Sequence, residues 1–203
     1  MDRDDDRAET IEVGSLAPGL LVAAPSMRDP LFGRSIILLV EHDDEGSFGL
    51  IVNREAPIDL DAVLDGAGVT AQVPMRGRPV YWGGPVQPEA GAVLYRADRP
   101  MSRYDPSSTI RAPLRISFSM SILQDVAAGD GPERFELFLG RAGWGPGQLE
   151  RELAEGSWLP LDLDERLIFG ETSGLGGRER WEHALGRLGA RPADIVGGAP
   201  AEA

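Results

Sequence analysis

The stretch of sequence that best predicts the fold is residues 34–53, RSIILLVEHDDEGSFGLIVN. Residues 35–40 are β-branched and continuously apolar, which is typical of a strand buried on both faces. Residues 43–46 supply a turn, and residues 48–52 supply a returning apolar strand. We therefore predict a β-hairpin over residues 34–53, with a loop of four or five residues.

Apolar segments on both sides of this hairpin predict the remaining elements. Further strands are expected at residues 20–25, 79–82, 92–95, 114–118 and 135–140. Helical spacing of apolar residues, with Gly or Pro near the ends, predicts short helices at residues 58–64, 122–128, 146–155 and 178–188. Hairpin-like strand pairs with interspersed helices indicate an α+β fold rather than a regular βαβ alternation.

The composition excludes several classes of site. All 20 cationic residues are Arg, 33 residues are Asp or Glu, and the formal net charge is −13. Without Cys there is no disulfide framework, iron–sulfur cluster or thiol nucleophile. Without Lys, Schiff-base, P-loop and kinase chemistry are excluded as well. We predict no metal site and no cofactor.

The chain length of 203 residues suits a single domain. Residues 1–13 are expected to be a disordered acidic arm, because residues 1–12 carry six acids, two Arg and no apolar run. Residues 14–190 are expected to form the domain, and residues 191–203 a loose tail. No apolar run approaches the ~20 residues of a membrane span, so we expect a soluble, cytoplasmic protein of undetermined oligomeric state.

His42 is the more notable of the two histidines. It follows Glu41 at the end of the most apolar strand and begins an acidic turn. Strand ends are where a rigid scaffold presents chemistry, and His titrates near neutral pH. His42 is therefore a turn residue bonded to nearby backbone, a catalytic base or ligand, or a surface residue that pairs with a neighbouring charge. His183, off the apolar face of its predicted helix, is expected on the surface.

Asn53 is the only Asn in the chain. Such a position can require a side-chain amide or a left-handed backbone, so a structural turn or cap is one interpretation. In a hairpin over residues 34–53, Arg34 lies near Asn53 at the open end, and an Arg beside an amide is a suitable anion- or carbonyl-binding pair. His42 lies at the opposite end, which argues against one small site that uses both His42 and Asn53.

Two Gly-rich stretches complete the candidate functional surface. The first, GGPVQ at residues 83–87, can approach a ligand or another strand closely because Gly has no Cβ. The second, GWGPGQ at residues 143–148, either offers free amides to an anion at a helix start or forms a tight turn with Trp144 in the core. The full candidate set is Arg34, Glu41, His42, Asn53, Gly83, Gly84, Pro85, Trp144, Gly145 and Gln148.

Six short motifs follow one another along the chain. They are MRDPLFGRS at 27–35, EH at 41–42, GLIVNR at 49–54, GGPV at 83–86, GWGPGQLE at 143–150 and WL at 158–159. In this order they resemble the YqgE/AlgH family, over residues 14–189. The resemblance implies a compact α+β domain around a large, bulged, mainly antiparallel, partly barrel-like sheet with short flanking helices. Val40 and Tyr95 stand where relatives often carry Cys and His, which removes a thiol role and weakens a His pair.

The family is often labelled a transcriptional regulator, without a settled molecular activity. Direct DNA contact would need a basic face or a reading helix, yet this chain is strongly acidic and its last predicted helix mixes Arg with Glu. We therefore expect regulation through a protein partner or small metabolite, without direct nucleic-acid or membrane binding. The alternative is a small-molecule-binding protein or an enzyme that uses a pocket near Arg34 and Asn53, or near His42 and the Gly-rich loops.

Overall fold

The structure is a computed structural model that describes residues 16–97, 109–170 and 175–189. The predicted acidic arm (residues 1–13) and C-terminal tail (residues 191–203) lie outside the described residues, so these two assignments remain predictions. Within the described part, the chain forms a single α+β domain, as the sequence predicts.

Ten strands of the described chain form one sheet. They are β1 (Gly19–Ala23), β2 (Ile36–Asp43), β3 (Gly46–Ile51), β4 (Glu55–Asp59), β5 (Pro79–Trp82), β6 (Val86–Arg96), β7 (Thr109–Arg111), β8 (Leu114–Ser117), β9 (Phe135–Trp144) and β10 (Trp158–Leu161). The main path runs β10-β1-β2-β3-β9-β6-β8-β7, with β5 pairing with β9 and β4 with β5. Only the β5–β9 pair is parallel among these strands, and the path does not close on itself.

The central hairpin is present, but its loop is shorter than predicted. Asp43 pairs with Gly46, which leaves a loop of two residues, Asp44 and Glu45. Gly46 supplies the positive φ of +136° at the end of this loop. Its missing Cβ also lets β9 approach, since a Cβ there would stand 2.5 Å from the carbonyl oxygen of Trp144. The sheet is also bulged, as expected, with register shifts in β2 and in β6.

The apolar residues of β2 are buried on both faces of the sheet. Ile36 and Leu38 pack into the cluster that includes residues of α5, whereas Ile37 and Leu39 pack into the cluster that includes Leu149 of α3. All four side chains are completely buried. Alternate side chains of a strand point to opposite faces, so a continuous apolar run is what a covered central strand requires.

Five helices cover the described sheet. They are α1 (Leu60–Gly66), α2 (Met120–Ala128), α3 (Gln148–Ala154), α4 (Glu165–Ile168) and α5 (Gly177–Arg187). Helix α1 begins two residues later than predicted because the Asp59 side chain caps it by accepting a hydrogen bond from the Ala62 amide. Helix α3 begins at Gln148 rather than Pro146, since Gly147 takes a left-handed conformation just before it. Four short elements, β4, β7, β10 and α4, are not predicted from the sequence.

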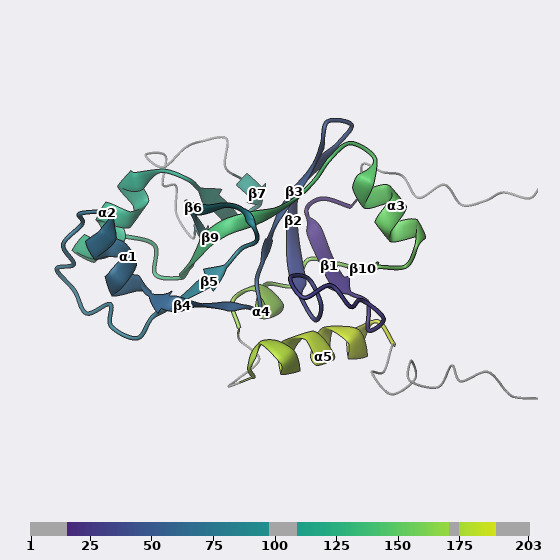
Figure 1. The fold of residues 1–203 in the computed structure, drawn as a ribbon. Helices are drawn as coiled ribbons and strands as arrows, with labels where there is room; N and C mark the ends of the chain where they lie inside the picture. Colours follow the sequence, from purple (N-terminus) through teal and green to yellow (C-terminus); the bar gives the residue numbers. More distant parts are fainter. Residues whose placement is uncertain (1–15, 98–108, 171–174, 190–203) are drawn as a thin grey trace, which may run out of the picture.

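The helices lie at different ends of the sheet (Figure 1). Helices α1 and α2 pack together on one end of the sheet, α3 lies at the opposite end, and α5 runs beneath β1 and β2. The indole of Trp181 in α5 donates to the carbonyl oxygen of Ala23 in β1 over 2.8 Å, which fixes this helix to the sheet. None of the described helices has the length and apolar character needed to cross a membrane.

Candidate functional site

The side-chain amide of Asn53 is a structural element. Its Oδ1 accepts a hydrogen bond from the Ile36 amide (2.7 Å), and its Nδ2 donates to the carbonyl oxygens of Arg34 (2.9 Å) and Gly177 (2.8 Å). Arg34 has a positive φ of 62° and an exposed side chain. The two residues do meet, but through the Arg34 backbone. The hypothesis of an anion-binding Arg–amide pair is therefore wrong, because both polar ends of the amide are already bonded.

Gly83 and Gly84 allow the segment after β5 to cross β9 at close backbone distance. A Cβ at Gly83 would stand 2.3 Å from the carbonyl oxygen of Gly140, and a Cβ at Gly84 would stand 2.2 Å from the carbonyl carbon of Arg141. The Gly83 amide donates to the Leu139 carbonyl oxygen (2.8 Å). These glycines therefore bring the backbone after β5 against β9. Pro85, the next residue, is exposed.

His42 lies beneath α3 with a completely buried side chain. Its Nδ1 is 2.6 Å from Ser47 Oγ across the hairpin, and its Nε2 is 3.9 Å from Glu150 Oε1 in α3. The prediction of a bond to nearby backbone is wrong, because the ring bonds to a side chain on the partner strand. A Ser–His–Glu line has the residue types of an activated nucleophile, but a buried ring offers a substrate no access. In this arrangement Ser47 anchors the ring, while the buried Nε2 faces Glu150 without a hydrogen-bond partner.

The turn between β9 and α3 is held by Gln148. Its Oε1 accepts from the Gly145 amide (3.1 Å), and its Nε2 donates to Glu152 Oε1 (2.8 Å). The side chain of Trp144 is 7% exposed and belongs to the core cluster under α3. Of the two interpretations, the tight turn with Trp144 in the core is therefore the one observed.

Two hollows lie on either side of Gly143 and Trp144, which line both. The first, which we name the indole pocket, has a volume of about 570 Å³. Its walls include Arg28, Asp29, Phe32, Trp144, Gln148, Glu152 and Trp158. Both indole N–H groups, of Trp144 (2.9 Å) and Trp158 (2.7 Å), donate to Glu152 Oε2.

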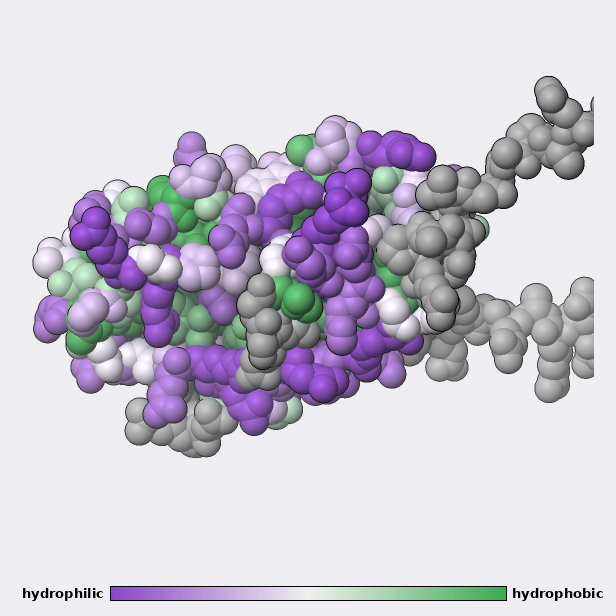
Figure 2. Space-filling view, turned by 90° about the horizontal axis from the view of Figure 1, so that it is seen from below, coloured by the Kyte–Doolittle hydropathy of each residue, from purple (hydrophilic) through white to green (hydrophobic). Residues whose placement is uncertain are grey.

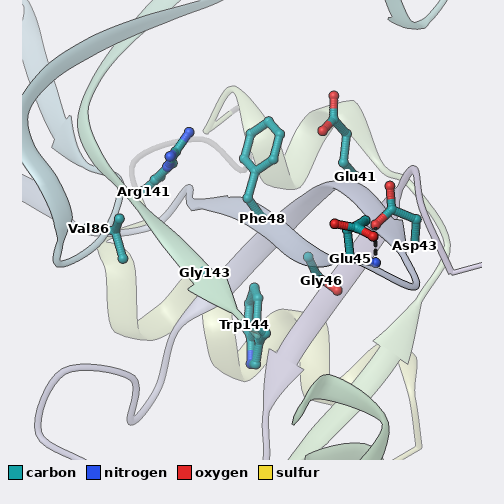
Figure 3. Close-up of a pocket in the computed structure, with 10 residues that line it drawn as sticks. Glu41, Asp43, Glu45, Gly46, Phe48, Val86, Arg141, Gly143 and Trp144 are labelled. Carbon is teal, nitrogen blue, oxygen red and sulfur yellow. Dashed lines mark hydrogen bonds between the residues drawn. The ribbon is translucent and has the colours of Figure 1, made fainter. Parts of the chain in front are cut away.

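The second hollow, which we name the hairpin pocket, has a volume of about 370 Å³ (Figure 3). Its walls include Glu41, Asp43, Glu45, Phe48, Val86 and Arg141. Figure 3 shows the three acids gathered on one side of the hollow, Arg141 on the other and Phe48 between them, while Trp144 points away. The Arg141 guanidinium lies 5.6 Å from the centre of the Phe48 ring.

The hairpin pocket unites three segments that the sequence singles out. Glu41 comes from the turn end of the hairpin, Val86 from the stretch 83–87, and Gly143 with Trp144 from the stretch 143–148. The individual candidates are less well placed. Only Glu41, Trp144 and Gln148 of the ten line either hollow. Among the described residues, no group of three or more His, Asp or Glu side chains is arranged to hold a metal ion.

Sequence reasoning missed several residues of these hollows. Glu152 is one, although its spacing of four residues from Gln148 on one helix was a usable signal. Phe48 is another. It contacts Phe118, with ring centres 6.4 Å apart, and Phe118 is 57% exposed. No sequence pattern indicates this contact, because the two residues are 70 positions apart in the chain.

A buried charged cluster lies away from both hollows, where α5 meets the sheet. Arg180 of α5 is 3% exposed and donates to the carbonyl oxygens of Leu167 and Ile168. It also faces Glu136 of β9. Burial raises the pKa of Glu136 to about 7, although nearby Arg side chains oppose this shift.

Comparison with known proteins identifies related sequences over nearly the whole chain. A family model described as AlgH-like matches residues 20–193. The UPF0301 protein RSc0675 of Ralstonia nicotianae is 40% identical over 184 residues, which cover 90% of this chain and 93% of that protein. A UPF0301 protein of Burkholderia mallei is 39% identical over the same shares of both chains.

Solved structures show the same relationship. The solution structure of the AlgH protein from Pseudomonas aeruginosa is similar with a TM-score of 0.72 and 32% sequence identity, over 100% of both chains. The X-ray crystal structure of protein DIP2367 from Corynebacterium diphtheriae is similar with a TM-score of 0.66 and 25% identity, over 84% of this chain and 86% of that one.

Proposed function

Because the chain belongs to the AlgH-like family, we propose that it is a regulatory protein that acts through a protein partner rather than by direct contact with DNA. We place this interaction in the cytoplasm and at the hairpin pocket. The observation that carries the proposal is the composition of that pocket, in which three exposed acids border an aromatic ring in a hollow of about 370 Å³.

The chemistry of the hairpin pocket favours a basic partner segment with an apolar anchor. Glu41, Asp43 and Glu45 outnumber the single Arg141, so the walls carry a net negative charge. Phe48 in the pocket wall, together with the exposed Phe118 that contacts it, supplies apolar contact area. A buried aromatic or aliphatic anchor gives affinity, and complementary charges around it give specificity and speed of association.

The arrangement of Arg on α5 argues against DNA binding by this helix. Arg178 forms an ion pair with Glu182 over 2.8 Å, Arg187 forms one with Asp164, and Arg180 is buried. The face of the molecule that includes α5 is mostly hydrophilic (Figure 2), but its charges are of both signs. DNA binding instead requires Lys or Arg that neutralise several phosphates at once.

Site-specific photo-crosslinking tests the proposed partner surface. We expect Phe118→p-benzoylphenylalanine to give light-dependent adducts in cells, with Lys or Arg beside an apolar residue in the crosslinked peptide. The same residue at Leu175, an apolar position that is 39% exposed before α5, is the matched control and should give none of these adducts. Charge reversal by Glu41→Arg with Glu45→Arg should abolish the adducts.

Two outcomes contradict the proposal. The first is that the adducts persist after the Glu41→Arg and Glu45→Arg reversal, or that the same charge change at the exposed Asp130 and Glu155 abolishes them as well. The second is sequence-selective retardation of duplex DNA in gel-shift experiments at ~50 mM salt, where phosphate contacts are strongest.

Small-ligand binding is the second candidate function, because the indole pocket encloses about 570 Å³ beside aromatic and charged side chains. Small-molecule sites usually have volumes of roughly 300–1,000 Å³. An enzymatic role for His42 has less support, since its ring is buried.

A further inference from the structure

The hydrogen bonds that the carboxylate of Glu152 accepts all come from neutral side chains. Oε2 accepts from the indoles of Trp144 and Trp158, and Oε1 accepts from the Gln148 amide. Within the described residues, no Arg or His forms an ion pair with Glu152. A carboxylate has about four acceptor positions, so three bonds leave one position, together with the full charge, for a further donor.

Three aromatic rings line the indole pocket together with this carboxylate, and both indoles direct their N–H edges towards it. The ring centres of Trp144 and Trp158 are 5.9 Å apart at an interplanar angle of 80°, and those of Phe32 and Trp158 are 6.0 Å apart at 77°. Neighbouring rings therefore stand nearly perpendicular. The electron-rich faces of Trp and Phe attract cations, and cages of such rings are how proteins recognise quaternary ammonium and methylated lysine groups.

The remaining charges of the pocket agree with a cationic ligand. Arg28 and Asp29 also line the hollow, so its three charged side chains leave one net negative charge. An anionic ligand would face repulsion from Glu152 and Asp29. The cationic group of such a ligand would donate to the free acceptor position of the Glu152 carboxylate. Arg28 could in addition bind a carboxylate group on the same ligand by donating hydrogen bonds to it.

We propose that the indole pocket binds an organic cation, an ammonium or guanidinium group held between the Glu152 carboxylate and the rings of Phe32, Trp144 and Trp158. The cation is either a free amine or the side chain of a Lys or Arg residue in a peptide. This inference rests on the second candidate function, ligand binding at this pocket, and does not involve the hairpin pocket.

The indole N–H signals of the protein in ¹⁵N-resolved NMR spectra test this directly. Trp144 and Trp158 line the pocket, whereas Trp82 and Trp181 do not. Titration with choline or agmatine should shift the Trp144 and Trp158 signals saturably and leave the other two unchanged. The uncharged choline analogue 3,3-dimethylbutan-1-ol should bind at least about tenfold more weakly, because it keeps the shape and loses the charge.

Variants assign the effect to Glu152. Glu152→Gln should weaken agmatine binding at least about tenfold, because the guanidinium and ammonium groups of agmatine can donate to the free acceptor position. Glu155→Gln, which removes the same charge from an exposed position just after the same helix, should leave agmatine binding unchanged. Because Glu152→Gln can disturb the bonds to both indoles, Trp158→Phe is the second variant. It keeps the Glu152 charge and a ring, but Phe attracts cations less strongly than Trp. Agmatine should therefore bind to this variant less tightly than to the wild type and more tightly than to Glu152→Gln, as read from the Trp144 signal.

The probes also distinguish a free amine from a peptide side chain as the source of the cation. They further distinguish failure of the cation inference from failure of ligand binding at this pocket. Tighter binding of the tripeptide Gly-Arg-Gly than of agmatine assigns the site to a peptide, and the reverse assigns it to a free amine. Equal binding of choline and its uncharged analogue overturns the cation inference but leaves ligand binding intact. If no cation shifts either indole signal at millimolar concentration, both the inference and the second candidate function are wrong.

Discussion

Asn53 connects three segments of the chain through one side chain. The loop before β2, the first amide of β2 and the start of α5 all bond to its amide. We expect Asn53→Ala to lower the free energy of unfolding by about 2–4 kcal/mol, since the buried Ile36 amide and two partly buried carbonyl groups lose their partner. Urea denaturation monitored by Trp fluorescence measures this loss.

Arg34→Ala is the control for this prediction. The Arg34 side chain is exposed, and only its carbonyl group bonds to Asn53, so the variant should lose less than about 0.5 kcal/mol. Asn53→Asp should be at least as destabilising as Asn53→Ala, because a carboxylate would face two carbonyl oxygens. An Asn53→Ala variant as stable as Arg34→Ala would refute the structural role of the amide.

Within the sheet, the close crossing of strand β9 with the segment after β5 depends on glycine. Gly140 has a φ of +71°, and a Cβ there would stand 2.2 Å from the carbonyl oxygen of Gly84. We expect Gly140→Ala to lower the free energy of unfolding by at least about 3 kcal/mol, because two backbone segments must separate. Thermal unfolding followed by circular dichroism measures the effect.

Gly156 is a matched control for the conformational part of this effect. It has the same φ of +71°, but a Cβ there would have no atom within 4 Å. Gly156→Ala should therefore cost only the strain of a left-handed alanine, about 1–2 kcal/mol. If the two variants are equally destabilised, the crossing does not depend on close backbone contact.

The buried charged cluster couples the stability of the whole molecule to pH. Burial raises the pKa of Glu136 to about 7 from 4.5. The other charged groups around it are Arg180, Arg78, Arg134 and Glu55. The folded protein therefore holds a proton on Glu136 at pH values where the unfolded chain has lost it. The contribution of Glu136 to the free energy of unfolding is fully present below about pH 4.5. This contribution falls as the pH rises towards 7, by at most about 3 kcal/mol.

Thermal unfolding from pH 5 to pH 8 tests this coupling. Glu136→Gln imitates the protonated side chain at every pH, so it should match the wild type near pH 5 and exceed its stability near pH 8. Glu133→Gln is the control, because this substitution removes the same charge from an exposed residue that lines a third hollow together with Glu136. A Glu136→Gln variant with the pH dependence of the wild type would show that Glu136 is already ionised at pH 5.

The parts of the fold that the sequence predicts correctly are those with a local pattern. The apolar run of β2, the cap of α2 at Gly129 and the apolar face of α5 are each encoded within a few neighbouring residues. Strands β4 and β10 escape prediction because they are short and are stabilised by pairing with strands distant in sequence. The loop of the hairpin was overestimated because strand pairing continues to Asp43 and Gly46.

The sequence by itself determined the acidic charge, the central hairpin, the α+β class and, through its ordered motifs, the family. Only the tertiary structure decided what each motif residue does. Asn53 and Gly83 have their contacts within the fold, whereas Glu41 and Trp144 line hollows. The physical reason is that a local pattern specifies backbone conformation, whereas the partners of a side chain depend on strand register and on how distant segments pack. Glu152 becomes a candidate ligand-binding residue only where β9 and β10 bring two indoles to it.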